Sequence, residues 1–119
     1  MHKSAETLLE DGMNLLAEGN PGEAATAFRA AIGADESCIE AHHGLIRALR
    51  DSSQLEQSVA AALALTALTP DDPLAHTALS ISLQTAGHVP EAEAAAGRAR
   101  ILEWKRELAA PHEEPREER

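Results

Sequence analysis

Two small groups of residues in the middle of the chain carry side chains that could do chemistry. Cys38 and His42 stand four residues apart, a spacing that places two side chains on one face of a helix. A thiol near a helix start and beside an imidazole is typical of reactive cysteines and of metal sites. The nearby sequence offers neither further ligands nor an orienting acid, so we expect no metal, no cofactor and no catalytic residue here.

The second group is basic and consists of His43, Arg47 and Arg50, which recur at helical spacing. Guanidinium groups on one helix surface donate charge-assisted hydrogen bonds to an Asp, a Glu or a C-terminal carboxylate. The alternative is a solvated helix face on which the two arginines pair with Glu40 and Asp51, as exposed pairs often do with little energetic effect. The sequence leaves both interpretations open.

The charge balance narrows the class of partner. Ten basic and twenty acidic residues give a net charge of −10, which repels phosphate backbones and anionic lipid surfaces. We therefore expect neither nucleic acid nor a membrane as partner. No glycine-rich phosphate loop and no Ser-His-Asp arrangement is present, so a binding protein is expected rather than an enzyme.

The number of cysteines and the N-terminal residues indicate the cellular compartment of the protein. A single cysteine, Cys38, cannot form an internal disulfide, which is typical of a reducing compartment. No apolar signal region follows the first four residues, and the longest apolar run, residues 59–65, is far shorter than the roughly 20 residues of a spanning helix. A cytoplasmic protein is expected.

The composition predicts that helices position these side chains. The chain has 25 alanines but one Phe, one Trp and no Tyr, a poor inventory for β-sheets, which favour aromatic and β-branched residues. Because each alanine removes little apolar surface from water, we expect stability to come from many small contacts.

A period of 34 residues organises these helices. Residues 40–42 and 74–76 align at that spacing, and further matches share the same register. The matching sets are Leu15, Leu49 and Leu83; Gly12, Ile46 and Ser80; Phe28, Ala62 and Ala96; and Ala31, Leu65 and Ala99. Bulky Phe28 opposite small Gly12, and small Ala62 opposite bulky Ile46, conserve volume between paired helices. In the third unit both Ser80 and Ala96 are small, so either its two helices approach more closely or the hairpin packs less tightly; we expect the third unit to be the softer one.

Each unit is interrupted at its middle, which predicts a helix, a turn and a second helix. The breaks fall at residues 19–22, 52–53 and 87–90. Ser37 with Glu40 and Ser53 with Glu56 have the spacing of capping boxes, while Asn20 before Pro21 and Asp72 before Pro73 also mark helix starts. The side chains at these starts are expected to accept hydrogen bonds from first-turn amides.

These features resemble the tetratricopeptide repeat, which has a period of 34 and a pattern of small and large residues matched by Gly12, Leu15, Ala24, Phe28 and Pro70. The resemblance implies an all-α solenoid of three helix-turn-helix repeats, over residues 5–38, 39–72 and 73–106, within a domain of residues 1–110. The closing proline is replaced by Trp104, so the last helix is expected to extend until Pro111. Residues 111–119 are expected to form a disordered acidic tail.

In this family the first helices of successive repeats line a concave face that binds a peptide or protein. The resemblance therefore implies an adaptor whose groove is formed by Leu9, Met13, Leu16, His43, Arg47, Arg50, Thr77, Ile81 and Gln84. The basic middle of this strip predicts a partner with an acidic or carboxylate-bearing segment. A family variant clamps chaperone C-termini with Lys and Asn. The corresponding positions hold Leu9, Met13, Gly44, Leu74 and Ala78, which cannot supply those donors.

A structural role is the alternative function: a self-associating scaffold that assembles through its terminal hairpins, with a homodimer through the C-terminal helix as one form. Residues 1–72 carry a net charge of −8 and residues 73–106 one of +1, so opposite ends attract. Trp104 and Leu108 on the extended helix would form the self-association surface, unless Trp104 packs against its own hairpin. Asp11, at an apolar position of the pattern, is expected to face outward at the other end. Recognition of RNA by helical repeats is disfavoured by the negative charge.

Overall fold

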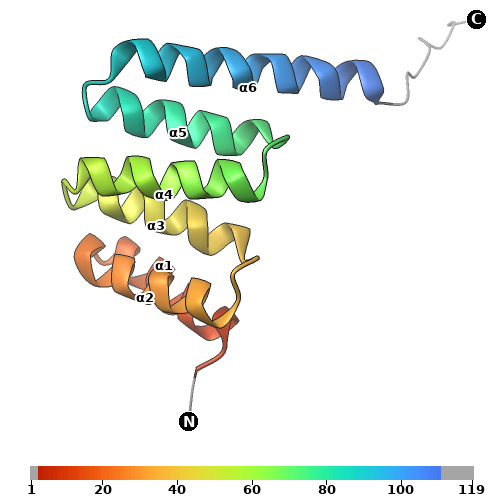
Figure 1. Ribbon diagram of the computed structural model, residues 1–119. Coiled ribbons are helices and arrows are strands. Elements are labelled where there is room, and N and C mark those ends of the chain that lie inside the picture. Colours follow the sequence, from red (N-terminus) through yellow and green to blue (C-terminus); the bar gives the residue numbers. More distant parts are fainter. Residues whose placement is uncertain (1–2, 111–119) are drawn as a thin grey trace, which may run out of the picture.

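The structure, a computed structural model, describes residues 3–110, which form six α-helices and no strand (Figure 1). The helices are α1 (Ala5–Ala17), α2 (Pro21–Ala34), α3 (Ile39–Asp51), α4 (Leu55–Leu68), α5 (Pro73–Thr85) and α6 (Val89–Ala109). They stack as three helical hairpins, so the predicted all-α solenoid of three helix-turn-helix repeats is confirmed. The tail predicted over residues 111–119 lies outside the described residues.

The predicted extension of the last helix is also confirmed. α6 has 21 residues and ends at Ala109; Ala110 is its C-cap and precedes Pro111, a residue type whose ring cannot continue a helix. Near its end, Arg106 lies 3.7 Å from Asp72, the residue that precedes α5. The final turn of α6 therefore projects past the start of α5, as Figure 1 shows.

The turn within each hairpin uses the same backbone conformation. Gly19, Ser53 and Gly87, spaced 34 residues apart, have φ values of 81°, 62° and 87°. This left-handed conformation lets the chain reverse after a helix, and glycine adopts it without the steric penalty of a Cβ atom. Ser53 adopts it with a side chain in place.

Both predicted capping boxes, at Ser37 and at Ser53, are wrong. α3 begins after Cys38, one residue later than predicted, and the Ser37 hydroxyl donates to Asp35 Oδ1 at 2.7 Å instead. α4 begins after Gln54, because Ser53 is used by the turn. Asn20 does precede α2 but makes no side-chain cap, whereas Asp72 caps α5 as predicted by accepting a hydrogen bond from the Leu74 amide at 3.0 Å.

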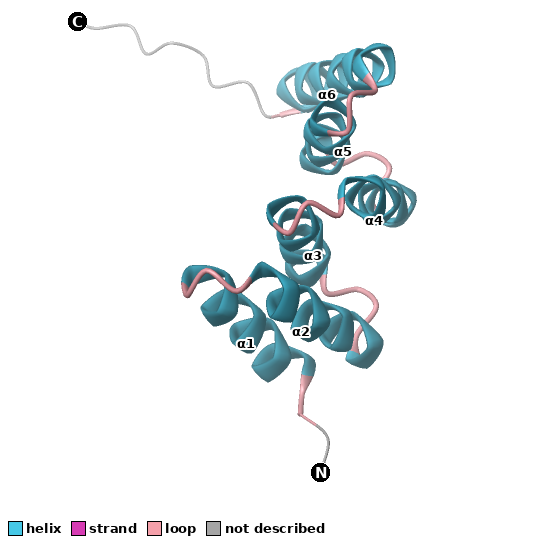
Figure 2. Cartoon of the chain, turned by 90° about the vertical axis from the view of Figure 1, so that its left-hand side faces the viewer, coloured by secondary structure: helices cyan, strands magenta, loops and turns pink. Residues whose placement is uncertain are grey.

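The helices alternate between an inner layer of α1, α3 and α5 and an outer layer of α2, α4 and α6; Figure 2 shows α3 to α6 nearly end-on. In the inner layer α1 packs against α3, and α3 packs against α5. In the outer layer α2 does not pack against α4, nor α4 against α6, although an ion pair of 2.7 Å joins Glu56 to His88. Because the inner helices approach one another and the outer ones diverge, the stack curves around α1, α3 and α5.

Phe28 is the centre of the first core cluster and is fully buried. Its ring lies against Gly12 of α1, as predicted: a Cβ atom built on Gly12 would be 2.6 Å from Phe28 Cε1. The ring also lies against Gly44 of α3, where a Cβ would be 2.5 Å from the same atom. Phe28 therefore joins the first hairpin to the second through two glycines that leave room for it.

The second core cluster joins the second and third hairpins with smaller side chains. Ile46 and Leu65 are its largest fully buried members, and α6 contributes Ala95. Between α5 and α6 the Ser80 hydroxyl donates a hydrogen bond to the Ala92 carbonyl oxygen at 2.8 Å. At the position where Ser80 and Ala96 are both small, a polar contact thus joins the two helices.

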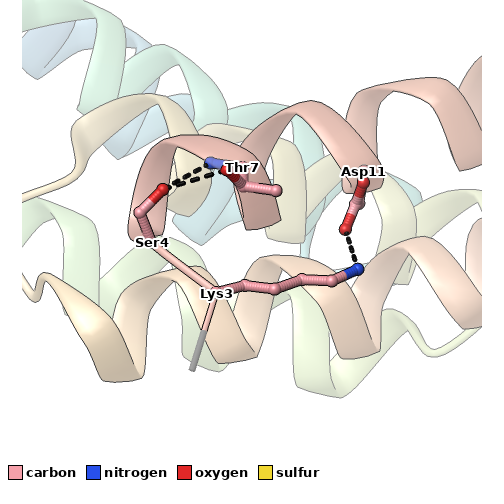
Figure 3. A network of polar contacts seen from close by, with 4 residues as sticks. All are labelled: Lys3, Ser4, Thr7 and Asp11. Carbon is pink, nitrogen blue, oxygen red and sulfur yellow. Dashed lines mark hydrogen bonds and ion pairs between the residues drawn. The ribbon is translucent and has the colours of Figure 1, made fainter. Parts of the chain in front are cut away.

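The outer surface of the first hairpin is polar. Lys3 Nζ lies 2.8 Å from Asp11 Oδ2, and Ser4 caps α1 through its hydroxyl, which accepts a hydrogen bond from the Thr7 amide (Figure 3). Asp11 thus faces outward at this end of the stack, as the sequence indicates. None of the helices described over residues 3–110 is long and apolar enough to cross a membrane.

Candidate binding sites

A cavity of 340 Å³ opens on the inner layer between α3 and α5, and we call it the inner pocket. Its lining consists of His43, Ile46, Arg47, Arg50, Leu74, Thr77, Ala78 and Ile81. It combines basic groups from α3 with apolar groups mainly from α5, which is the composition of a site for a peptide with an acidic group beside an apolar one.

The two arginines of the inner pocket differ in their surroundings. Arg47 is exposed, and its Nε atom lies 3.6 Å from Asp51 Oδ2, one helical turn away. Arg50 is half-buried, and no ion pair to it is found within residues 3–110. The surface-pairing interpretation therefore holds for Arg47 and Asp51, while the guanidinium of Arg50 stays available to a ligand.

His43 is half-buried in the first half of α3, and it is the side chain of the inner pocket whose ordinary pKa lies near neutral pH. Burial lowers the pKa of His43 below its ordinary value of 6.5, because desolvation disfavours the charged imidazolium. The carboxylate of Asp72 opposes this shift, and the neighbouring His42 adds to it. The imidazole is therefore neutral at pH 7.

The structure unites five of the nine residues predicted for the groove: His43, Arg47, Arg50, Thr77 and Ile81 line the inner pocket. The α1 residues do not. Leu9 and Leu16 are half-buried against the first core cluster, and Met13 is 56% exposed. Gln84 is exposed near the end of α5. The prediction missed Leu74, which is 60% exposed and lines the inner pocket. In the sequence Leu74 was noted only as a position that lacks the Lys or Asn of a chaperone clamp, and its apolar side chain was not counted as a contact.

The sequence analysis also missed a larger apolar cavity on the outer layer. This outer groove, of 510 Å³, lies between α2 and α4 and over α3. Leu45 and His42 come from α3, and the Arg29 guanidinium donates to Gln57 Oε1 at 3.1 Å from one wall to the other. Only the divergence of the outer helices creates this space, and no local pattern reports it.

A third cavity, the head groove, has a volume of 640 Å³ and lies between α1 and α2 at the N-terminal end of the stack. It has an acidic rim made of Asp11, Glu18 and Glu23, with Lys3 paired to Asp11. At the opposite end Trp104 and Leu108 are 63% and 71% exposed. The interpretation in which Trp104 packs against its own hairpin is therefore wrong.

The histidines of the repeat register hold the loops between hairpins. His42 Nε2 lies 2.9 Å from the Glu36 carbonyl oxygen, and His76 Nε2 lies 2.8 Å from that of Pro70, six residues earlier in both cases. Each histidine therefore has a backbone partner in the loop that precedes its own helix. Cys38 is half-buried, and within residues 3–110 no group of three or more His, Cys, Asp or Glu side chains is arranged to hold a metal ion.

Solved structures share this fold at low sequence identity. MamA superposes with a TM-score of 0.82 at 18% identity, over 91% of this chain and 63% of MamA. A chain of the CopN–Scc3 complex gives 0.75 at 21% identity, over 82% of this chain and 58% of that one. The present chain thus spans less than two thirds of both proteins.

A third structure is of similar length: the second tetratricopeptide domain of Spaghetti (RPAP3), solved with an HSP90 peptide, has a TM-score of 0.74 at 16% identity, over 82% of this chain and 91% of that domain. No curated protein sequence matches the chain. Residues 15–81, more than half of the chain, match the family model for the tetratricopeptide repeat. Together with the three hairpins of the structure, this match shows that the chain belongs to the tetratricopeptide repeat family.

Proposed function

We propose that the chain is a protein-interaction module without catalytic activity, which binds an acidic or carboxylate-bearing peptide segment in the inner pocket. The observation that carries the proposal is the placement of Arg47 and Arg50 beside Leu74 and Ile81 in one cavity, within a chain of net charge −10. Basic groups that gather in one concave place of an acidic protein attract the opposite charge.

The size of the inner pocket favours a short segment. A volume of 340 Å³ is at the lower end of the roughly 300–1,000 Å³ typical of ligand sites, so it accommodates a few side chains of an extended peptide. Beyond the pocket, Met13 and the half-buried Leu9 and Leu16 on α1 are available to apolar residues of a longer partner, and Gln84 to its polar groups.

Solved structures of similar fold support binding to protein segments, since the RPAP3 domain was solved with an HSP90 peptide and another similar chain belongs to the CopN–Scc3 complex. The donors of a chaperone clamp are nevertheless missing here. Gly44 lies against the Phe28 ring and has no room for a side chain, and Leu74 and Ala78 present apolar groups to the inner pocket. The expected partner therefore carries its acidic group close to Arg50 and an apolar residue close to Leu74.

The proposal is tested with two pools of labelled heptapeptides that differ in their last three residues, Asp and Glu in one pool and Asn and Gln in the other. Fluorescence anisotropy should show tighter binding of the acidic pool, and added salt should reduce the difference because it screens exposed charges. Arg47→Glu with Arg50→Glu should weaken binding of the acidic pool about tenfold or more, since charge-assisted hydrogen bonds contribute about 1.5 kcal/mol or more each.

The matched control is Arg29→Glu with Arg98→Glu, which makes the same change of charge outside the inner pocket. Circular dichroism of both variants reports whether the helices remain intact. Equal affinity for the two pools, or equal weakening in the test and control variants, would show that the inner pocket does not recognise an acidic segment.

A further inference from the structure

The head groove and the outer groove are the same surface in two successive repeats. Six residues that line the head groove have counterparts 34 residues later that line the outer groove. The head-groove residues are Leu8, Asp11, Glu23, Thr26, Ala27 and Ala30, and their counterparts are His42, Leu45, Gln57, Ala60, Ala61 and Ala64. In the second hairpin this surface packs against α2. The first hairpin therefore exposes the equivalent surface.

The two grooves differ in one wall. In the outer groove the second helix of the preceding repeat and the loop after it supply that wall, through Arg29, Ile32, Gly33 and Glu36. In the head groove none of the helices described over residues 3–110 supplies it. Among the described helices, the head groove is therefore an acceptor surface with this wall left open.

The other end of the chain carries residues in the register of the missing wall. Two repeats after the wall residues of α2, α6 has Gly97, Arg100, Ile101 and Trp104, which we call the tail face. Ile101 is 46% exposed and Trp104 is 63% exposed. A further cavity of 210 Å³ lies beside them, between α5 and α6. Its residues Thr77, Ile81 and Ala96 are two repeats after Leu9, Met13 and Phe28, the region that receives α3.

We propose that copies of this chain associate head to tail, with the tail face of one copy as the missing wall of the head groove of the next. The partner is a second copy, because the repeat makes its α6 equivalent to the helix that fills this position inside the chain. The α1 helix of the second copy then packs against α5 and α6, as α3 packs against α1 and α2. This interface shares Thr77 and Ile81 with the edge of the inner pocket, but it does not use Arg47, Arg50 or Leu74, so different variants test the two proposals.

Charge favours this pairing of opposite ends. The head groove has three acidic residues and Lys3, whereas residues 97–107 of α6 have four basic residues, Arg98, Arg100, Lys105 and Arg106, against the acidic Glu103 and Glu107. Glu23 takes the place of Gln57, which accepts a hydrogen bond from Arg29 across the outer groove. The counterpart of Arg29 in the tail face is Gly97, so Arg98 or Arg100 beside it would form an ion pair with Glu23 in place of that hydrogen bond.

Asp11 keeps the association weak and reversible. Its counterpart Leu45 is buried, so docking of the tail face would enclose a carboxylate. Lys3, at 2.8 Å, accompanies it as a counter-ion, and the carboxylate is therefore not enclosed alone. Because the head and tail surfaces are different, the interface does not close on itself, and the association continues beyond a dimer as concentration rises.

Sedimentation velocity over a concentration series is the first test. The parent chain should show an average mass that rises past the dimer at high concentration and falls again in high salt. Asp11→Leu, which places the internal residue in the head groove, should strengthen association at least tenfold. A parent chain and an Asp11→Leu variant that are both monomeric at every concentration would overturn the proposal.

Complementary blocked ends provide the second test. Glu23→Arg with Ala30→Arg blocks the head groove, and Ile101→Asp with Trp104→Asp blocks the tail face; the altered side chains are exposed, so the fold should persist. Each variant should be monomeric alone, and their mixture should form a dimer that grows no further. The controls Glu10→Arg and Leu63→Asp change exposed residues outside both ends and should associate like the parent.

A symmetric dimer through α6 would give the opposite pattern. The head-blocked variant would then dimerise alone, and mixing it with the tail-blocked variant would produce no new species. Monomeric blocked variants that stay separate on mixing would equally exclude the head-to-tail interface. Circular dichroism confirms that each variant is folded before any of these outcomes is interpreted.

Discussion

Phe28 and the two glycines around it show how single residues set the geometry of the stack. The ring of Phe28 fills the space between α1, α2 and α3, and a methyl group on Gly12 or Gly44 would approach it to less than 3 Å. Such contacts between a fully buried ring and backbone have no route for relaxation except a shift of a helix. The junction between the first two hairpins therefore depends on residue size at three positions.

Gly44→Ala should destabilise the protein although alanine is the better helix former. Overpacking against Phe28 costs about 1–3 kcal/mol, which the helix propensity of alanine offsets by about 1 kcal/mol. Urea denaturation measures the net change in the free energy of unfolding. Gly33→Ala is the control, because nothing lies within 4 Å of a Cβ at that position, and it should be neutral or stabilising. Phe28→Leu combined with Gly44→Ala should recover part of the loss, and full additivity of the two changes would contradict the contact.

His43 links the inner pocket to pH. Burial lowers its pKa below 6.5, so the folded protein binds fewer protons than the unfolded chain as the pH falls below 6.5. The contribution of His43 to stability is therefore present above its ordinary pKa and declines as the pH falls toward its lowered pKa. Over that same interval protonation adds a third positive charge beside Arg47 and Arg50.

Binding of the acidic heptapeptide pool should strengthen about two- to fivefold as the pH falls through the pKa of His43, because one further partly exposed ion pair contributes up to about 1 kcal/mol. Anisotropy titrations between pH 7.5 and about 5 measure the effect, and NMR of the imidazole reports its pKa directly. His43→Gln removes the titrating group and should flatten the profile. An unchanged profile in that variant would assign the pH dependence to the peptide carboxylates instead.

At the level of the helices, each turn within a hairpin requires a positive φ at one position, and one of the three turns has no glycine there. Gly19 and Gly87 meet the demand for positive φ, while Ser53 at the same place of the second hairpin meets it with a side chain. For an ordinary residue this conformation costs roughly 1–2 kcal/mol. The turn persists because α3 and α4 pack on both sides of it, so the tertiary structure holds a residue in a conformation that it disfavours.

Ser53→Gly should therefore stabilise the protein by about 0.5–1 kcal/mol, after the larger entropy of glycine in the unfolded chain is allowed for. Thermal and urea denaturation provide the measurement. Ser52→Gly, one residue earlier, is the matched control and should destabilise, because the Ser52 hydroxyl donates to the Ala48 carbonyl at 2.8 Å and φ there is −93°. Equal effects of the two substitutions would mean that the backbone at Ser53 carries no strain.

At the scale of the whole molecule, stability is distributed unevenly along the stack. The four largest fully buried side chains, Phe28, Ile46, Leu49 and Leu65, all belong to α2, α3 and α4. The buried residues of α6 are Ala92, Ala95, Ala99 and Leu102, and in α5 the hydroxyl of Ser82 is buried without a hydrogen-bond partner. Since a repeat array unfolds by parts when its interfaces differ in strength, its ends should open first.

Hydrogen exchange followed by mass spectrometry tests this gradient at a concentration where the protein is monomeric. Amides of α3 and α4 should exchange most slowly, and those in the last two turns of α6 most rapidly among the helices. The start of α6 is held to α5 by the hydrogen bond from the Ser80 hydroxyl to the Ala92 carbonyl oxygen, so its amides should exchange at an intermediate rate. Uniform exchange across all six helices would indicate a single cooperative unit in place of a soft third hairpin.

The helices and their order were predictable from the chain, because the patterns that indicate them are local. The 34-residue register placed Phe28 opposite Gly12, indicated three hairpins and predicted that α6 extends to Pro111. The prediction failed at single caps, where Ser37 and Ser53 are recruited by turns instead. One or two residues of turn geometry decide where a helix begins, and periodicity cannot resolve them.

Which side chains share a cavity depends on how the hairpins pack. Arg47 and Arg50 were predicted from one helix. How successive hairpins rotate against one another decides their meeting with Leu74, the packing of Leu9 and Leu16 against the first core cluster, and the exposure of Trp104. That rotation follows from the volumes packed between helices, such as Phe28 against Gly44. The match between the head groove and the tail face has the same origin: the repeat supplies equivalent positions, and packing decides which of them are left uncovered.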